Sequence, residues 1–142
     1  MKFKSKKDPL LTTLILGLNL FLIGVAFSRL TLNHIKKTDY WGITLILAVV
    51  ALLFWIQFGT YYKLSKNELT YRSGPISGKI HTDRIKEIIK GKTLWVGLKP
   101  ATSRKGLIIK YDTYNEIYIS PKTNELFIEK TLEINSNIKI TE

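Results

Sequence analysis

Few residues of this 142-residue chain have the types and spacing that catalysis requires. The two histidines, His34 and His81, lie on opposite sides of a long apolar run, so they cannot bind one metal ion together. Asp83 and Glu87 are four residues apart, but a carboxylate pair on a surface segment is usually only solvated. An active site would require a pocket that gathers His81, Asp83 and a serine or threonine. Because nucleophile-elbow, P-loop and dinucleotide motifs are also missing, we predict no enzyme activity, no cofactor and no metal site.

A run of basic residues is the strongest candidate for a binding surface. Its seven bases are interrupted by one acid, Glu87. Attraction to anionic lipid headgroups or to an acidic partner is one interpretation, and a solvated surface without a ligand is the other. A tryptophan within the run either enters the membrane interface or anchors a partner, or else packs over the mouth of the domain. The predicted site consists of Lys86, Lys90, Lys92, Trp95, Lys99, Arg104, Lys105 and Lys110.

The overall charge also points to an anionic partner. The chain has a formal net charge of +11 and contains no cysteine, so it has no disulfide and no thiolate metal site. Basic domains usually meet nucleic acid or anionic lipid. Since no nucleic-acid-binding motif is present, we predict lipid and exclude nucleic acid.

Two apolar blocks precede the basic run, at residues 10–27 and 40–58, and neither contains a charged residue. As helices, blocks of this length reach roughly 27–29 Å, about one hydrocarbon thickness. Two such blocks joined by a short polar loop predict a transmembrane hairpin. A cleaved signal peptide is the minor alternative for the first block, which is longer than an ordinary signal core and lacks a good cleavage pattern.

The distribution of basic residues predicts the orientation of this hairpin. Two spans place both chain ends on one side of the membrane, and basic residues near the bilayer favour the cytoplasm. The side with the chain ends has more basic residues near the bilayer than the loop side. We therefore predict a cell-membrane protein with both termini in the cytoplasm. The compared residues are Lys2, Lys4, Lys6, Lys7, Lys63, Lys66 and Arg72 on that side, and Arg29, Lys36 and Lys37 in the loop.

Asn19 is the one strongly polar side chain within the apolar core of either span. A ligand or transport site is one interpretation, and a single hydrogen bond between the two helices is the other. We expect the hydrogen bond, because no charged residue lies at mid-membrane, where a pump or carrier would need one.

The remainder, residues 60–142, forms a second domain after the hairpin of residues 1–59. Alternating apolar residues around Lys66-Asn67 and around 112–115 predict two β-hairpins, with a further strand on each side of a corner near Asp83. Residues 91–105 are irregular, and a helix over about 121–134 would start at Ser120 and Pro121. Several antiparallel strands closed by one helix are typical of a pleckstrin-homology-like (PH-like) barrel.

Three short motifs of the second domain belong together, namely YYKL at residues 61–64, SGP at 73–75 and ISPK at 119–122. With these motifs the chain resembles the YyaB-like bacterial PH-domain family across residues 60–133. Members typically have an N-terminal pair of spans, a YYxL–strand–SGP opening and an ISPK closing motif. The positions carrying the resemblance are mostly turn and core residues, so they specify a fold and no reaction. They are Tyr61, Tyr62, Leu64, Leu69, Ser73, Gly74, Pro75, Ile80, Ile85, Ile119, Ser120, Pro121, Lys122, Phe127 and Leu132.

The resemblance implies a membrane-anchored interaction module without catalysis, which binds a membrane protein or peptide partner, anionic lipid, or both. Specific phosphoinositide binding is not expected, because the second strand lacks the usual K-x-R element. A more distant similarity to membrane-attached PH-like proteins of bacteriocin self-immunity implies an alternative, which is protection against a peptide toxin.

Overall fold

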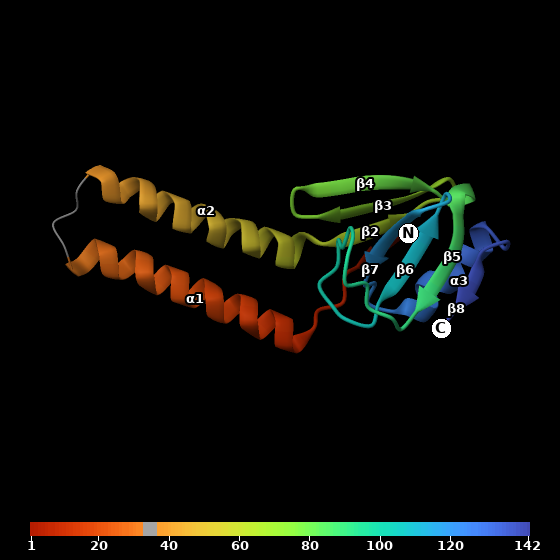
Figure 1. Ribbon diagram of the computed structural model, residues 1–142, viewed down its shortest axis with the longest axis horizontal. Helices are drawn as coiled ribbons and strands as arrows, with labels where there is room; N and C mark the ends of the chain where they lie inside the picture. The colour runs from red at the N-terminus through yellow and green to blue at the C-terminus, as the bar shows by residue number, and fades with distance from the viewer. Residues whose placement is uncertain (33–36) are drawn as a thin grey trace.

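The computed structural model describes residues 1–32 and 37–142 (Figure 1). Two long helices lie side by side and project from one end of a β-sandwich. The predicted fold class is confirmed, namely a helical hairpin followed by a PH-like antiparallel sandwich with a C-terminal helix. His34 and Lys36, used in the predictions above, lie outside the described residues.

The two helices are α1 (Pro9–Leu32) and α2 (Lys37–Gly59). Within them, residues 9–31 and 40–59 are long and apolar enough to cross a membrane. Only 11% of an apolar 18-residue window in each helix is buried by the rest of the chain, whereas the core helix of a soluble protein is mostly buried. Asp8 precedes α1 and accepts a 3.0 Å hydrogen bond from the amide of Leu10, while Pro9 occupies the first helical position.

The sandwich consists of two four-stranded sheets. The first has the order β1-β2-β3-β4, and the second has the order β7-β6-β5-β8. All pairs are antiparallel except β5 with β8. The strands are β1 (Lys2–Lys4), β2 (Tyr61–Leu64), β3 (Glu68–Ser73), β4 (Ile76–His81), β5 (Ile85–Lys90), β6 (Leu107–Tyr111), β7 (Asn115–Ile119) and β8 (Lys139–Thr141).

The predicted hairpins and the corner appear at the expected places. β2 pairs with β3, β6 pairs with β7, and a 3₁₀ turn at Thr82–Arg84 joins β4 to β5. Side chains in β3 alternate between the core and the outside, as the sequence pattern requires. The loop 91–106 between β5 and β6 contains no strand or helix, as expected for residues 91–105.

Strand β1 was not predicted, and it lies before the helical hairpin. It pairs with β2 in register, Phe3 opposite Tyr62, and the N-terminal ammonium donates a 2.5 Å hydrogen bond to the carbonyl oxygen of Leu64. The β-domain therefore uses residues on both sides of the helices, beyond the segment 60–142. Because β1 and β2 share one sheet, both must lie on the same side of any membrane that the helices cross.

The C-terminal helix begins later than the sequence pattern suggested. α3 extends over Asn124–Ile134 with Thr123 at its N-cap position. Ser120 instead donates and accepts hydrogen bonds inside the domain, and Pro121 forms a β-bridge with Ser5. These contacts hold residues 120–121 against the N-terminal segment and Tyr62, outside the helix.

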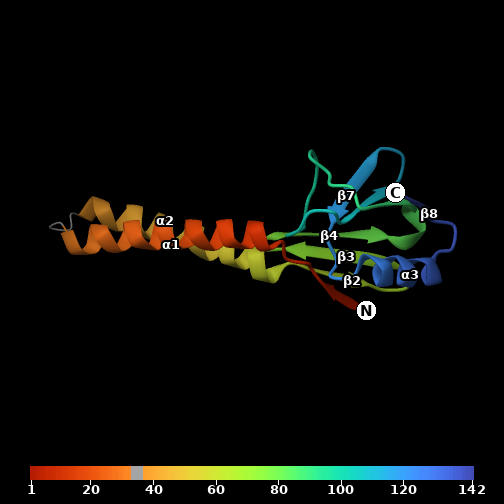
Figure 2. The same ribbon diagram turned by 90° about the horizontal axis from the view of Figure 1, so that it is seen from below.

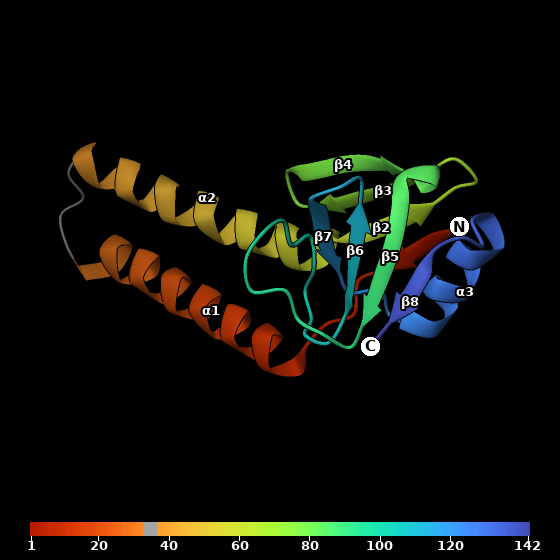
Figure 3. The ribbon, with the colours of Figure 1, turned by 45° about the vertical axis from the view of Figure 1, so that its right-hand side comes forward.

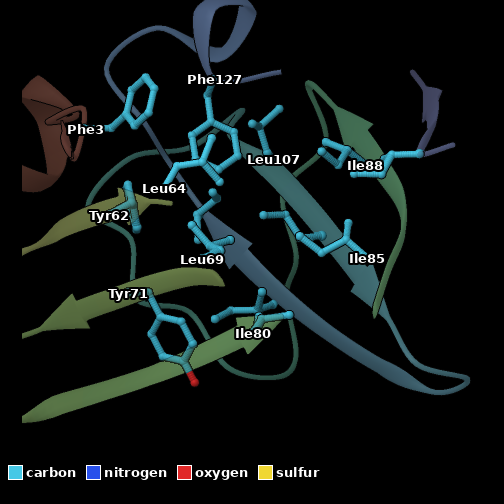
Figure 4. Close-up of a cluster of buried hydrophobic side chains, with 14 residues drawn as sticks. Phe3, Tyr62, Leu64, Leu69, Tyr71, Ile80, Ile85, Ile88, Leu107 and Phe127 are labelled. Atoms are coloured by element: carbon cyan, nitrogen blue, oxygen red, sulfur yellow. The ribbon is translucent and has the colours of Figure 1, made fainter. Parts of the chain in front are cut away.

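The core lies between the two sheets and under α3 (Figure 4). Tyr62, Leu69 and Ile88 are fully buried, and Phe127 of α3 packs edge-on against Phe3 of β1 at a centroid distance of 5.1 Å. The strand that precedes α1 and α2 is thus part of the hydrophobic core.

The sandwich is fixed directly to the end of α2. The hydroxyl of Thr60 donates a 2.7 Å hydrogen bond to the carbonyl oxygen of Ile56 and lies 2.9 Å from the hydroxyl of Ser73. Gly74, at a φ of +56°, lets the β3–β4 turn lie against Ile56, since a β-carbon there would approach the Ile56 side chain to 2.7 Å. The junction therefore contains no flexible linker.

Candidate functional site

The predicted basic surface divides into two separate groups. Lys86, Lys90 and Lys110 lie on β5 and β6, whereas Lys92, Trp95, Lys99, Arg104 and Lys105 belong to the loop 91–106. Figures 1 and 3 show this loop at the end of the sandwich from which the helices project, and Figure 2 agrees. The structure therefore does not bring the eight residues together on one face.

Three of the predicted cations are engaged in ion pairs. Lys90 pairs with Glu125 at 2.9 Å, Lys110 with Glu87 at 3.3 Å, and Arg104 with Asp8 at 2.7 Å. Among the described residues, no ion pair involves the other four cations. The cations available to an outside anion are Lys86, Lys92, Lys99 and Lys105.

The tip of the loop 91–106 presents apolar side chains to solvent. Trp95 and Val96 are each 82% exposed, so Trp95 does not pack over the mouth of the domain. The ammonium of Lys99 lies 6.0 Å from the centre of the Trp95 ring. An exposed tryptophan beside lysines suits the interface between lipid headgroups and water, where the ring and the ammonium both find favourable surroundings.

The base of the same loop is firmly held. Tyr118 donates its amide to the carbonyl oxygen of Leu98 at 3.0 Å, and Gly91 donates to Gly106 at 3.1 Å. Arg104 binds Asp8 directly before α1, and its hydrogen bond is the main reason why the pKa of Asp8 lies below its ordinary value. The loop is thereby attached to the start of α1.

A buried cluster of hydroxyl groups joins the N-terminal segment to the domain. Tyr62 donates a 2.6 Å hydrogen bond to the carbonyl oxygen of Pro100 and accepts one from the Ser120 amide at 3.0 Å. Ser5 lies 2.9 Å from both the Ser120 and Thr102 hydroxyls. Burial raises the pKa of Tyr62, so this phenol stays neutral and acts as a structural donor. No sequence motif could have identified this cluster.

A cavity, which we call the distal cavity, opens at the end of the sandwich opposite to the loop 91–106. It has a volume of about 790 Å³ and is lined by the β2–β3 turn, the 3₁₀ turn and the end of α3. His81, Thr82 and Asp83 all line it, which is the combination that an active site would require.

The geometry of these three residues does not form a catalytic relay. The Thr82 hydroxyl is 4% exposed and donates to the carbonyl oxygen of Lys66 at 2.9 Å. Among the described residues, no hydrogen bond joins His81 to Thr82 or Asp83, and no group of three His, Asp or Glu could hold a metal ion.

Asn19 faces α2 within its own hairpin and is 1% exposed. Neither polar atom of its side chain has a hydrogen-bond partner among the described residues, so the expected bond between the helices is not made. Gln57, near the end of α2, makes such a bond instead, donating to Thr12 at 2.8 Å.

Comparisons with known proteins agree with the fold. The sequence model of a family described as "Bacterial PH domain" matches residues 60–135. A protein from Bacillus subtilis (strain 168), described as "Uncharacterized protein YyaB", is 28% identical over 141 residues, covering 99% of this chain and 97% of its own length. No solved structure matches. Neither description mentions a toxin, so the immunity alternative gains no support from them.

Proposed function

The chain belongs to the bacterial PH domain family, and from that premise we propose that it is a membrane-anchored interaction module that contacts anionic lipid headgroups through the loop 91–106. PH-like domains generally bind rather than catalyse. The two apolar helices cross the membrane in this proposal, and the domain stays at the membrane surface.

The observation that carries the proposal is the exposed tip of this loop beside the helices. Trp95 and Val96 would be poorly placed in water, but they suit the interfacial layer of a bilayer. Lys92 and Lys99 flank them in sequence and each adds about 1 kcal/mol of attraction when close to an anionic leaflet.

The rigid attachment of the domain supports the same function. The loop is attached to α1 through Arg104 and Asp8, and the sandwich contacts α2 through Thr60 and Gly74. A module held in this way is always at high effective concentration toward lipids and membrane proteins, so weak contacts are sufficient.

We further propose that both termini face the cytoplasm, as the distribution of basic residues favours. A reporter that is active on only one side of the membrane, fused after Glu142, tests this orientation. A cytoplasmic signal supports contact with the inner leaflet. An external signal would contradict the orientation and move the domain to the outer face.

Fluorescence of Trp95 tests the lipid contact. The substitutions Trp41→Phe and Trp55→Phe leave Trp95 as the only tryptophan of the three in the chain. In nanodiscs containing phosphatidylglycerol, we expect blue-shifted emission and quenching by lipids brominated near the headgroup. Added salt should weaken both effects, because it screens the lysines.

The matched control places the indole at the other end of the sandwich. Tyr114 is 95% exposed in the β6–β7 turn, away from the helices (Figures 1 and 2). In a chain with Trp41→Phe, Trp55→Phe, Trp95→Phe and Tyr114→Trp, the emission should remain that of an indole in water. If Trp95 gives the same emission as this control, the proposed contact is wrong.

A further inference from the structure

The distal cavity lies at the end of the sandwich that faces away from α1 and α2 (Figures 1 and 3). Its volume of about 790 Å³ is within the range of about 300–1,000 Å³ typical of sites for small ligands. Headgroups of the host bilayer lie at the opposite end of the domain. An occupant of the cavity must therefore come from the aqueous phase.

The walls of the cavity are preformed. Thr82 donates its amide to the carbonyl oxygen of Asn67 at 3.0 Å, and its own carbonyl oxygen accepts a 3.0 Å hydrogen bond from the Asn135 side chain. Asn135 also accepts from the amide of Asn137 at 3.1 Å. These bonds join the β2–β3 turn, the 3₁₀ turn and the end of α3, so little order has to be gained on binding.

The charges around the cavity favour an anion. Lys66 and Lys86 line it from two elements, and neither belongs to an ion pair among the described residues. Asp83 is the one acid that lines it. The neighbouring acid Asp112 forms an ion pair with Arg84. Carboxylates are suitable partners, because they accept charge-assisted hydrogen bonds from ammonium groups.

The cavity also has an apolar part. Ile85 is 3% exposed, and Ile134 at the end of α3 is half-buried. A free phosphate would neither fill the volume of the cavity nor contact this apolar surface. We infer that the distal cavity binds an acidic segment of a partner protein, with carboxylates at Lys66 and Lys86 and an apolar side chain over Ile134. The domain would then hold lipid at one end and a partner at the other.

The test uses the full chain in phosphatidylcholine nanodiscs and a fluorescent peptide, Glu-Glu-Leu-Glu-Glu-Leu, followed by fluorescence anisotropy. We expect saturable binding that added salt weakens. The double substitution Lys66→Glu and Lys86→Glu should reduce the affinity about tenfold or more, because both ammonium groups become repulsive. A peptide with glutamine in place of glutamate should bind at least about tenfold more weakly.

The control variant carries Lys92→Glu and Lys99→Glu, which change the net charge equally but lie in the loop 91–106. It should keep the affinity for the acidic peptide. Absence of binding to the wild type, or an equal loss in both variants, would overturn the inference. So would displacement of the peptide by added phosphatidylglycerol vesicles, because lipid would then be the ligand of the cavity. The loop variant separately reports on the lipid contact of the proposed function.

Discussion

Asp8 accepts a 2.7 Å hydrogen bond from Nε of Arg104, a residue 96 positions further along the chain. Asp8 is only 8% exposed and also caps α1. This ion pair therefore connects the start of α1 to the loop that carries Trp95. In the proposed function, it fixes the position of this loop relative to the membrane.

Acid should remove this connection. The hydrogen bond from Arg104 holds the pKa of Asp8 below its ordinary value of 3.8. A carboxylate whose pKa is lowered by folding stabilises the folded state fully at pH values above its ordinary pKa. This contribution is lost as the pH falls from the ordinary pKa through the lowered one. We expect Asp8→Asn, which keeps a capping oxygen, to unfold at a lower temperature than the wild type at pH 7.

The difference between the two proteins should shrink as the pH falls below 3.8. Thermal unfolding in nanodiscs, followed by circular dichroism at pH 7 and at a series of lower pH values, measures it. Other carboxylates with lowered pKa, such as Glu68 and Glu87, titrate in both proteins and cancel in this comparison. A difference that does not change with pH would show that the Asp8 charge has no role.

Removing the Tyr62 hydroxyl should destabilise the domain. In Tyr62→Phe, the carbonyl oxygen of Pro100 and the amide of Ser120 lose a buried partner. Leaving such groups unpaired costs about 1–3 kcal/mol of unfolding free energy. Tyr71→Phe is the matched control, because no hydrogen bond of the Tyr71 hydroxyl occurs in the described part of the chain. Urea unfolding of both variants gives the comparison, and equal losses would argue against the hydroxyl cluster.

Truncation of the Phe3 side chain should lower the free energy of unfolding nearly as much as truncation of a residue in the centre of the core. Phe3 is 7% exposed and contacts Phe127. Truncation of a buried phenylalanine costs about 3–5 kcal/mol, whereas Lys4→Ala on the exposed side of β1 should change little. Urea unfolding of Phe3→Ala checks this. If the two variants are equally stable, β1 does not belong to the folded domain.

Replacing Asn19 should not weaken the hairpin. Its buried amide has no partner among the described residues, and an unpaired polar group in an apolar setting is unfavourable. We expect Asn19→Leu to resist unfolding by sodium dodecyl sulfate at least as well as the wild type. Gln57→Leu, which loses the bond to Thr12, serves as the contrast. A marked loss in Asn19→Leu would mean that a water molecule or another helix binds the amide.

The sequence predicted the elements whose signals are local. The helices follow from apolar length, and β3, β6 and β7 follow from alternating side chains next to turn residues. β1 and β8 were missed, because a strand of three residues shows almost no periodicity and its pairing depends on a distant partner. Lys2 and Lys4 look like an ordinary basic flank until Phe3 is seen in the core.

The candidate site shows the same limit. A list of basic residues gives the total charge, but it does not say which cations are already paired. Arg104 and Lys90 are neutralised by Asp8 and Glu125, both distant in sequence. The distal cavity combines residues from three segments, so only the fold could reveal it.

The position of β1 has a consequence for how the protein is made. In the chain, β1 precedes the two apolar helices and its partner β2 follows them. If these helices span the bilayer as proposed, the first sheet cannot close until both ends of the hairpin lie on one side. A chain with one helix inserted the wrong way leaves Phe3 and β2 on opposite sides, so its domain lacks a core residue and has an open sheet edge. Folding of the domain thus selects correctly inserted chains, and quality-control proteases would find the others by that exposed edge.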